Sequence, residues 1–236
     1  MLRLPALVLL LVAVLALAAC GSDDDSDNAS TPSDSVDTTA TTPATKGGCK
    51  TVEQPAPKAG AKADKPSKDL DASKTYTVDF VTSCGDFTVT LDAKNDPKTA
   101  SSFANLVEQG FYDGLTFHRI SPGFVIQGGD PEGTGMGGPG YSVEEAPKPD
   151  TTYPRGTVAM AKTGAEPPGT SGSQFFVVTA EDASAPPFSL PPDYAVAGKV
   201  TKGLDVVNRI GALPTKPGSE EPAQPVVIEK ATLTAS

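Results

Sequence analysis

The chain has 236 residues and a formal net charge of -10, from 19 lysines and arginines against 29 aspartates and glutamates. Such an acidic chain has no basic stripe for a phosphate backbone, which argues against nucleic-acid binding. With one histidine and three cysteines, it is also poorly supplied with zinc ligands, and we predict no metal site.

The first 19 residues have the pattern of an export signal. Arg3 precedes an apolar run from about Leu4 to Leu17, which is short for a spanning helix and has no basic stop-transfer flank. The ending Leu17-Ala18-Ala19-Cys20-Gly21 resembles the bacterial lipobox. This resemblance implies that Cys20 is acylated, with palmitate-type chains holding the protein at the extracytoplasmic face of the cell membrane. The alternative is an ordinary cleaved signal with a cysteine nearby by chance.

Residues 20–74 are expected to form a low-complexity tether. Ser, Asp and Thr dominate up to about residue 48, and the stretch 50–74 continues with Pro, Ala and Lys, which predicts a stiffer linker. Nearly all Phe and Tyr residues lie later in the chain. Only residues 75–236 can therefore build a core, and we predict one domain there.

Two cysteines remain after Cys20, namely Cys49 and Cys84. Export would place them in an oxidising compartment, where an even number of cysteines favours a disulfide. Such a bond would close a loop of about 35 residues and stabilise the fold by roughly 3 to 4 kcal/mol in the chain-entropy model. A pair of free thiols is the alternative.

The rest of the chain shows many short strand patterns. Tyr76–Phe80 and Phe87–Leu91 alternate apolar and polar residues and predict a hairpin. Asp96-Pro97 is a helix-start signal, and Gly110 is expected to end that helix. Further strands are predicted at residues 157–161, 174–178, 194–200 and 226–233, a short helix at residues 204–210, and an irregular loop over the glycine-rich residues 133–141. This composition predicts an all-β sandwich or barrel.

The stretch Phe117 to Asp130 carries the strongest functional signal. It reads Phe-His-Arg-Ile-Ser-Pro-Gly-Phe-Val-Ile-Gln-Gly-Gly-Asp, and Gly172 to Phe176 reads Gly-Ser-Gln-Phe-Phe. Both resemble the signature of the cyclophilins, which are peptidyl-prolyl cis/trans isomerases. The resemblance implies a closed eight-stranded antiparallel barrel with two capping helices, and activity on X-Pro bonds without metal or cofactor. It also implies a surface groove that binds proline-containing polypeptides.

The family's site residues carry over one by one. Arg119 matches the catalytic arginine, and Gln127 matches the glutamine that helps to place it. Matches to the walls of the groove are Phe124, Val125, Phe176 and Leu190 for the proline pocket, Ala161 and Lys162 for the backbone that pairs with the peptide, and Gln174 for a polar position.

Several positions depart from the family. Tyr194 stands where a histidine is usual, Ser189 where many members have tryptophan, Val125 where methionine is common and Lys162 where asparagine is common. These changes lie around the pocket, so substrate preference should differ and tight cyclosporin binding is not expected. The only histidine, His118, neighbours Arg119 on a predicted strand, where successive side chains face opposite ways. If Arg119 faces the groove, His118 should face away from it, in a structural role.

The sequence favours a monomeric, lipid-anchored isomerase that assists the folding of exported proteins. A proline-peptide binding or scaffolding module that has lost catalysis is the main alternative, and a surface adhesion protein that uses the barrel as a scaffold is a weaker one.

Overall fold

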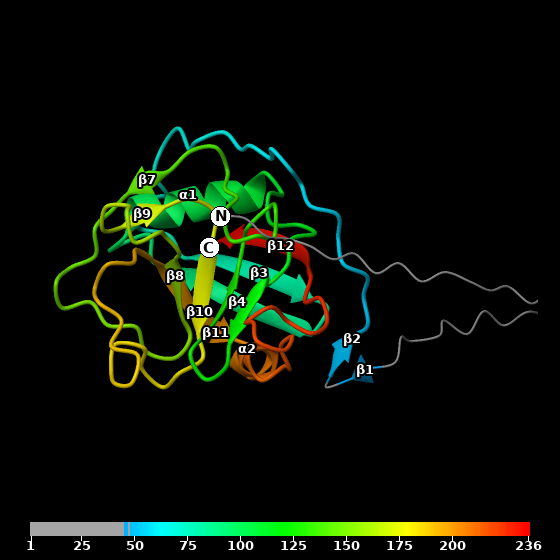
Figure 1. Ribbon diagram of the computed structural model, residues 1–236. Helices are drawn as coiled ribbons and strands as arrows, with labels where there is room; N and C mark the ends of the chain where they lie inside the picture. Colours follow the sequence, from blue (N-terminus) through cyan, green and yellow to red (C-terminus); the bar gives the residue numbers. More distant parts are fainter. Residues whose placement is uncertain (1–44, 47) are drawn as a thin grey trace, which may run out of the picture. The chain divides into compact units, whose positions relative to one another are not determined.

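The computed structural model describes residues 45–46 and 48–236 (Figure 1). The predicted signal peptide and Cys20 lie outside these residues. The strands are β1 (Thr45–Lys46), β2 (Cys49–Lys50), β3 (Tyr76–Thr82), β4 (Gly85–Leu91), β5 (Arg119–Ser121), β6 (Val125–Gly128), β7 (Val143–Glu144), β8 (Thr157–Met160), β9 (Thr170–Ser171), β10 (Phe175–Val178), β11 (Val196–Lys202) and β12 (Ile228–Ala235). The helices are α1 (Pro97–Glu108) and α2 (Leu204–Gly211). Among the described residues, no helix is both long enough and apolar enough to cross a membrane.

Eight strands form one antiparallel sheet in the order β12-β3-β4-β11-β8-β10-β6-β5. The sheet curls into a half-barrel, with α1 packed at one end, against β11 and β12, and α2 at the other, against β4 and β6 (Figure 1). The two short strands β7 and β9 form a separate pair, as do β1 and β2. The all-β class, the hairpin β3–β4 and both helices are thus confirmed.

The closed barrel that the resemblance implied is not what the structure shows. The edge strands β5 and β12 are not paired with each other. The chain just before β5 meets the start of β12 around the bridge between Thr116 and Val227, where the N–H groups of Gly114 and Phe117 donate to the carbonyls of Ile228 and Val226 at 2.7 and 2.9 Å. Beyond that bridge, the N–H of Ile120 donates to the carbonyl of Glu220, in the loop 214–225, at 2.7 Å. That loop contains Pro222 and Pro225, which have no N–H for a strand ladder, so pairing stops there.

The main core lies between the concave side of the sheet and α1. Aromatic rings fill it: Phe80 stacks on Phe87 at 4.9 Å, and Phe103 of α1 contacts Tyr112 at 5.1 Å and Phe175 at 5.4 Å between ring centroids. Phe103, Leu106 and Val107 point inward from α1, as their helical spacing predicted. This core is packed with side chains, and any binding site must therefore lie on the outside of the sheet.

The N-terminus of α1 is capped by a residue that is distant in the sequence. Asp96 takes the N-cap position, as predicted, but its carboxylate makes no capping bond. The N–H groups of Lys98 and Thr99 donate instead to the carboxylate of Glu145, at 3.2 and 2.8 Å. Burial, together with the nearby charges of Glu145 and Asp92, raises the pKa of Asp96 to about 6.

Residues 51–74, the second part of the predicted tether, lie along the surface of the domain. Cys49 forms a disulfide with Cys84 in the β3–β4 turn, and at the other end of the segment the N–H of Thr75 donates to the carbonyl of Ser236 at 2.9 Å. Between these ends, the backbone of Asp64 pairs with the side chain of Gln109, the residue after α1, and Leu70 packs against the main core. In Figure 1 this segment is the blue-to-cyan trace that passes from β2 to the α1 end of the domain.

Candidate active site

Strand register places Arg119 and Gln127 side by side. They are direct partners in the β5–β6 pair, so their side chains leave the sheet on the same face. Nη1 of Arg119 donates to Oε1 of Gln127 at 3.1 Å, and Nε2 of Gln127 donates to Oε1 of Gln174 at 3.0 Å. The predicted pair therefore forms the start of a hydrogen-bonded row on the outer face of the sheet.

The conformation of Gly129 brings Gln174 within reach of this row. Gly129 has φ of +83°, and a Cβ there would lie 2.4 Å from the carbonyl oxygen of Ser173. Ser173 in turn donates from its hydroxyl to the carbonyl of Gly129 at 2.7 Å. Only glycine allows both the positive φ and this close approach, which explains the second glycine of the signature's Gly-Gly in physical terms.

Arg119 also has a partner that sequence reasoning missed. Its Nε donates to Oε2 of Glu220 at 2.6 Å, and about a third of the arginine side chain is exposed. Hydrogen bonds from the side chains of Ser121 and Arg119 hold the pKa of Glu220 below its usual range. The guanidinium is thus fixed on two sides, by Glu220 and by Gln127. No local motif marks Glu220, which lies in a proline-rich loop 101 residues away.

The predicted proline-pocket residues form a cluster separate from the main core. The cluster contains the predicted pocket residues Phe124, Val125, Phe176, Leu190 and Tyr194, together with Ala161, which was assigned to the backbone that pairs with the peptide. The Tyr194 ring meets Phe176 edge-on, with centroids 5.5 Å apart. Tyr194 therefore supplies an aromatic surface to this cluster, as expected for its position.

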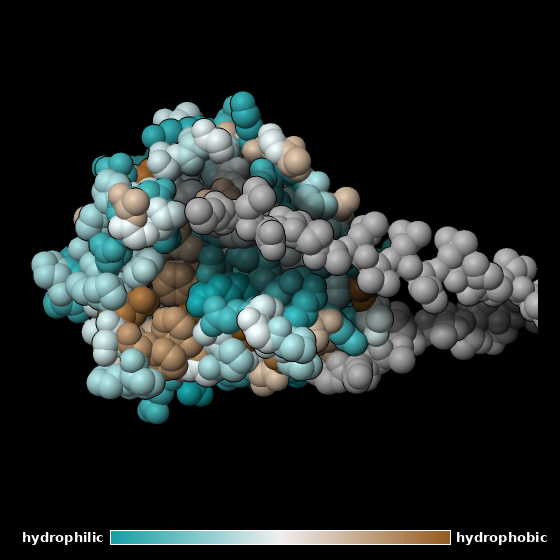
Figure 2. All heavy atoms as spheres, viewed as in Figure 1, coloured by the Kyte–Doolittle hydropathy of each residue, from teal (hydrophilic) through white to brown (hydrophobic). Residues whose placement is uncertain are grey.

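A second missed residue is Phe188. It stacks on Phe124, with ring centroids 4.3 Å apart and planes 13° from parallel, and it is 38% exposed. Phe188 directly precedes Ser189, which occupies the position where many family members carry tryptophan. The sequence showed that the aromatic was missing at 189, but not that its neighbour Phe188 stacks on Phe124. On the face drawn in Figure 2, apolar residues gather where the loop 183–192 lies in Figure 1, with hydrophilic residues next to them.

Lys162 has a role beyond its backbone. Its side chain is only 2% exposed, its Nζ lies 2.5 Å from the Asp193 carboxylate, and the same nitrogen lies 5.5 Å from the centre of the Tyr194 ring. Nζ also donates to the carbonyl of Glu166 at 3.1 Å. A buried lysine of this kind is stable only when it is paired. It holds Tyr194 and the loop after β8 together, as an asparagine in its place could not.

A cavity of about 460 Å³ opens on the Gln174 side of the row. Its lining includes Gln127, Gln174, Ala161 and Lys162, and the segment 135–142 forms another wall. The predicted site residues therefore divide into a polar part around this cavity and an aromatic part around Phe124 and Phe176. An extended peptide could contact both.

His118 faces away from Arg119, as strand alternation predicted. It lines a small cavity of about 30 Å³ with Gln54 and Glu221, and neither ring nitrogen has a hydrogen-bond partner among the described residues. Burial lowers the pKa of His118. No group of three or more His, Cys, Asp or Glu side chains able to hold a metal ion occurs among residues 48–236.

Comparison with known proteins identifies the family. The model of the cyclophilin type peptidyl-prolyl cis-trans isomerases matches residues 77–233. The chain belongs to this family. The cyclophilin relatives include a protein named peptidyl-prolyl cis-trans isomerase-like 1 from Homo sapiens, 41% identical over 165 residues, which cover 68% of this chain and 94% of that protein. A protein of the same name from Neurospora crassa is 40% identical over 154 residues, covering 64% of this chain and 89% of its own.

Solved cyclophilin structures have a fold similar to that of this chain. A cyclophilin type isomerase from Cryptosporidium parvum superimposes with a TM-score of 0.61 at 32% identity, covering 68% of this chain and 98% of its own. A structure of the same protein in the presence of the dipeptide Ala-Pro gives a TM-score of 0.60 at 31% identity, covering 67% and 98%. The half-barrel with two helices described here is therefore the cyclophilin fold, and the strands β5 and β6 carry the family signature.

Proposed function

We propose that this cyclophilin catalyses cis/trans isomerisation of X-Pro bonds in exported proteins, and that a lipid on Cys20 holds it at the extracytoplasmic face of the bacterial cell membrane. The observation that carries the activity is the fixed guanidinium of Arg119 beside an apolar cluster. Export and anchoring are supported by the pattern of the first 20 residues, and a monomeric state is part of the proposal.

The reaction needs no nucleophile, because no bond to the substrate is made or broken. The barrier of about 18 to 20 kcal/mol comes from amide resonance, and uncatalysed X-Pro exchange takes tens to hundreds of seconds. In the twisted transition state the proline nitrogen regains a lone pair. A donor aimed at that nitrogen, together with an apolar clamp on the ring, stabilises the twisted amide more than the planar one.

Each part of this mechanism has a residue in the groove. Arg119 is charged at all physiological pH values and supplies the donor, with its geometry set by Gln127 and Glu220. Phe124, Phe176 and Leu190 supply the apolar surface for the proline ring. Gln174 extends the polar side of the groove toward the 460 Å³ cavity, where the rest of the peptide would lie.

The activity is tested with a protease-coupled assay on a short X-Pro peptide. We expect kcat/KM of Arg119→Ala to fall about 100-fold, the cost typical of removing one transition-state donor. Peptide binding without any rate enhancement by the wild-type protein would contradict catalysis and support the scaffolding alternative. If Arg119→Ala were as fast as the wild type, the mechanism would be wrong.

Anchoring is tested separately. Mass spectrometry should find acyl chains on Cys20, and Cys20→Ser should move from the membrane fraction to the soluble one. A Cys20→Ser variant that stayed on the membrane would refute the lipoprotein assignment without affecting the isomerase claim.

A further inference from the structure

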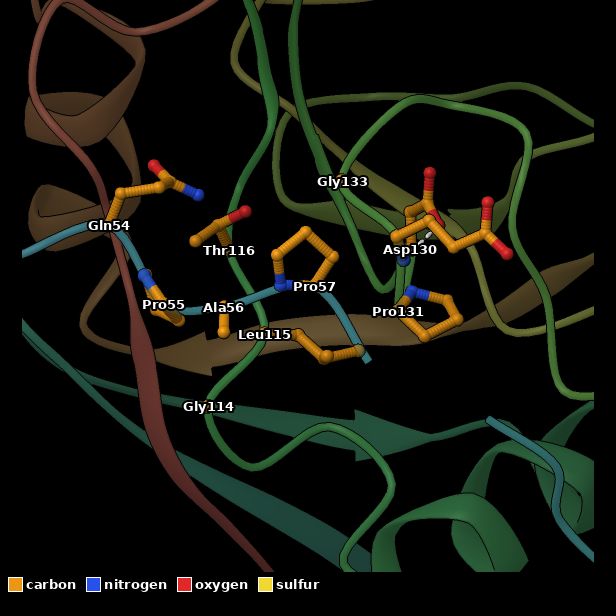
Figure 3. A pocket seen from close by; sticks show the side chains of 11 residues that line it. Gln54, Pro55, Ala56, Pro57, Gly114, Leu115, Thr116, Asp130, Pro131 and Gly133 are labelled. Carbon is orange, nitrogen blue, oxygen red and sulfur yellow. Dashed lines mark hydrogen bonds between the residues drawn. The ribbon is translucent and has the colours of Figure 1, made fainter. Parts of the chain in front are cut away.

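The segment 54–64, which we call the strap, crosses the domain beside the residues 114–116 and 130–133. It precedes the residues that match the family model, which begin at 77. Figure 3 shows the chain from Gln54 to Pro57 passing over Gly114 to Thr116, with the Pro57 ring between Thr116 and Pro131. A cavity of only about 20 Å³ lies between the strap and the domain.

The strap holds the segment 131–142, here called the groove loop, at two backbone positions. The N–H of Lys58 donates to the carbonyl of Pro131 at 2.7 Å, and the N–H of Ala63 donates to the carbonyl of Pro139 at 3.0 Å. Between them, Lys62 lies over Gly140, where an added Cβ would be 3.3 Å from Cγ of the lysine. Both ends of the groove loop are therefore tied to the strap.

The groove loop is fixed from the inside by Asp130. This carboxylate is 1% exposed and accepts N–H bonds from Glu132 at 2.8 Å and from Gly135 at 2.5 Å. Burial alone would raise the pKa of Asp130, but these backbone donors hold it below its usual range. A Cβ on Gly137 would lie 2.1 Å from Oδ1 of Asp130, so the loop folds tightly over it.

From the groove loop, hydrogen bonds lead to the catalytic arginine. Nε2 of Gln174 donates to the carbonyl of Gly137 at 2.9 Å, and Gln174 accepts from Gln127, which accepts from Arg119. The same loop, from Gly135 on, forms a wall of the 460 Å³ cavity. Any shift of the loop thus changes both the wall of the cavity and the partner of Gln174.

We propose that the strap is a positioning element of the isomerase, which sets the groove loop and so determines how the enzyme binds peptides that extend beyond the proline. This inference rests on the proposed isomerase activity. It predicts that residues of the predicted tether change KM for longer peptides, although none of these residues enters the proline pocket.

The test uses proline substitutions in the full chain. Lys58→Pro with Ala63→Pro removes the two N–H donors that reach the groove loop. The matched control is Ala59→Pro. The N–H of Ala61 donates to the carbonyl of Lys58, and Gly60 has φ of +70°, which makes Ala59 the second residue of a type II turn, where proline fits. The control adds a proline without removing a bond to the groove loop.

In the double variant we expect KM for a longer X-Pro peptide to rise about threefold to tenfold, with kcat changed less than twofold, because a displaced wall weakens binding of the extended chain. A short X-Pro peptide that stays in the proline pocket should keep its kcat/KM within about twofold. Hydrogen exchange of the residues 133–142 should accelerate. Ala59→Pro should resemble the wild type in all three measurements.

Three outcomes would overturn the proposal. One is an unchanged KM for the longer peptide despite faster exchange in the groove loop. Another is an equal loss of kcat/KM for short and long peptides together with a lower unfolding midpoint, which would indicate general destabilisation. The third is unchanged exchange in the groove loop. If the wild type had no isomerase activity, the proposed function would fail, whereas hydrogen exchange and binding of the longer peptide would still test the strap.

Discussion

The two walls of the groove are built in different ways. The near wall, from Arg119 to Gln127, lies on the paired strands β5 and β6, where register alone brings the arginine and the glutamine together. The far wall comes from the loop 183–194. In this loop Phe188 stacks on Phe124 of the near wall, and Tyr194 lies under the charged nitrogen of Lys162. The proposed catalytic group thus lies on regular structure, and the proposed substrate-binding surface opposite it depends on loop packing.

The largest effect that would test this comparison is expected at Glu220. Glu220→Gln keeps the shape of the side chain but removes the charge that fixes Nε of Arg119, and charge-assisted bonds are about twice as strong as neutral ones. We expect kcat to fall about tenfold with KM within about twofold, since the guanidinium acts in the transition state. Steady-state kinetics on a short X-Pro peptide would measure both.

The control for Glu220 is its neighbour. Glu221 pairs with Lys216 and not with Arg119, so Glu221→Gln should keep the wild-type kcat. Equal losses in the two variants would mean that the loop 214–225 matters as a whole and that Glu220 has no specific role in placing the arginine.

A smaller effect is expected on the far wall. Phe188→Ala removes the ring that stacks on Phe124, and an aromatic pair is worth about 0.5 to 1.5 kcal/mol beyond its buried area. We therefore expect KM to rise about threefold to fivefold, while kcat stays close to that of the wild type. Titration of a proline peptide into both proteins would measure the loss of affinity directly.

Phe188→Tyr serves as the control, because it keeps the stacked ring. If it lost as much affinity as Phe188→Ala, the stacking interpretation would be wrong. If Phe188→Ala lowered kcat and left KM unchanged, the two walls would not divide catalysis and binding as described.

The smallest effect on activity is expected at Asp96, which lies away from the groove at the start of α1. Its pKa is raised to about 6, so the folded state binds the proton more tightly than the unfolded state does. Stability should fall as pH rises from about 4 to about 6 and stay lower above that. Asp96→Asn should remove this dependence and stabilise the protein at pH 7 by about 1 kcal/mol, allowing for solvent screening of a half-buried group.

Urea unfolding of the wild type and Asp96→Asn at pH 4.5 and pH 7.5 would check this. Asp205→Asn, which changes an exposed carboxylate in the first turn of α2, is the control and should not increase the stability at pH 7.5. Isomerase activity should stay within about twofold of the wild type in both variants. A gain that was the same at both pH values would contradict the assignment to Asp96.

Sequence reasoning predicted the near wall better than the far wall for a physical reason. The β3–β4 hairpin, both helices and the Arg119–Gln127 pair follow from local periodicity and from a signature contiguous in sequence. Phe188 and Glu220 come from proline-rich loops whose paths depend on tertiary packing, so no local pattern placed them. The roles assigned to Phe124, Phe176 and Leu190 as pocket walls stay predictions, although the structure gathers them in one cluster.

Two predictions differ from the structure because they depend on tertiary contacts: the closed barrel and the tether that contains the strap. The resemblance implied full closure, but prolines in the loop 214–225 interrupt pairing next to Ile120. Composition predicted a free tether through residue 74, because the segment 50–74 has few large apolar residues. Backbone N–H groups, which composition does not reveal, hold that segment against the domain.

The disulfide between Cys49 and Cys84 has a mechanical consequence. It joins the chain to the β3–β4 turn just before the strap begins. A pull on the chain before Cys49 therefore enters the domain through a covalent bond into the hairpin and bypasses the two hydrogen bonds that hold the groove loop. The groove is in this way shielded from tension on the N-terminal segment as long as the cysteines are oxidised.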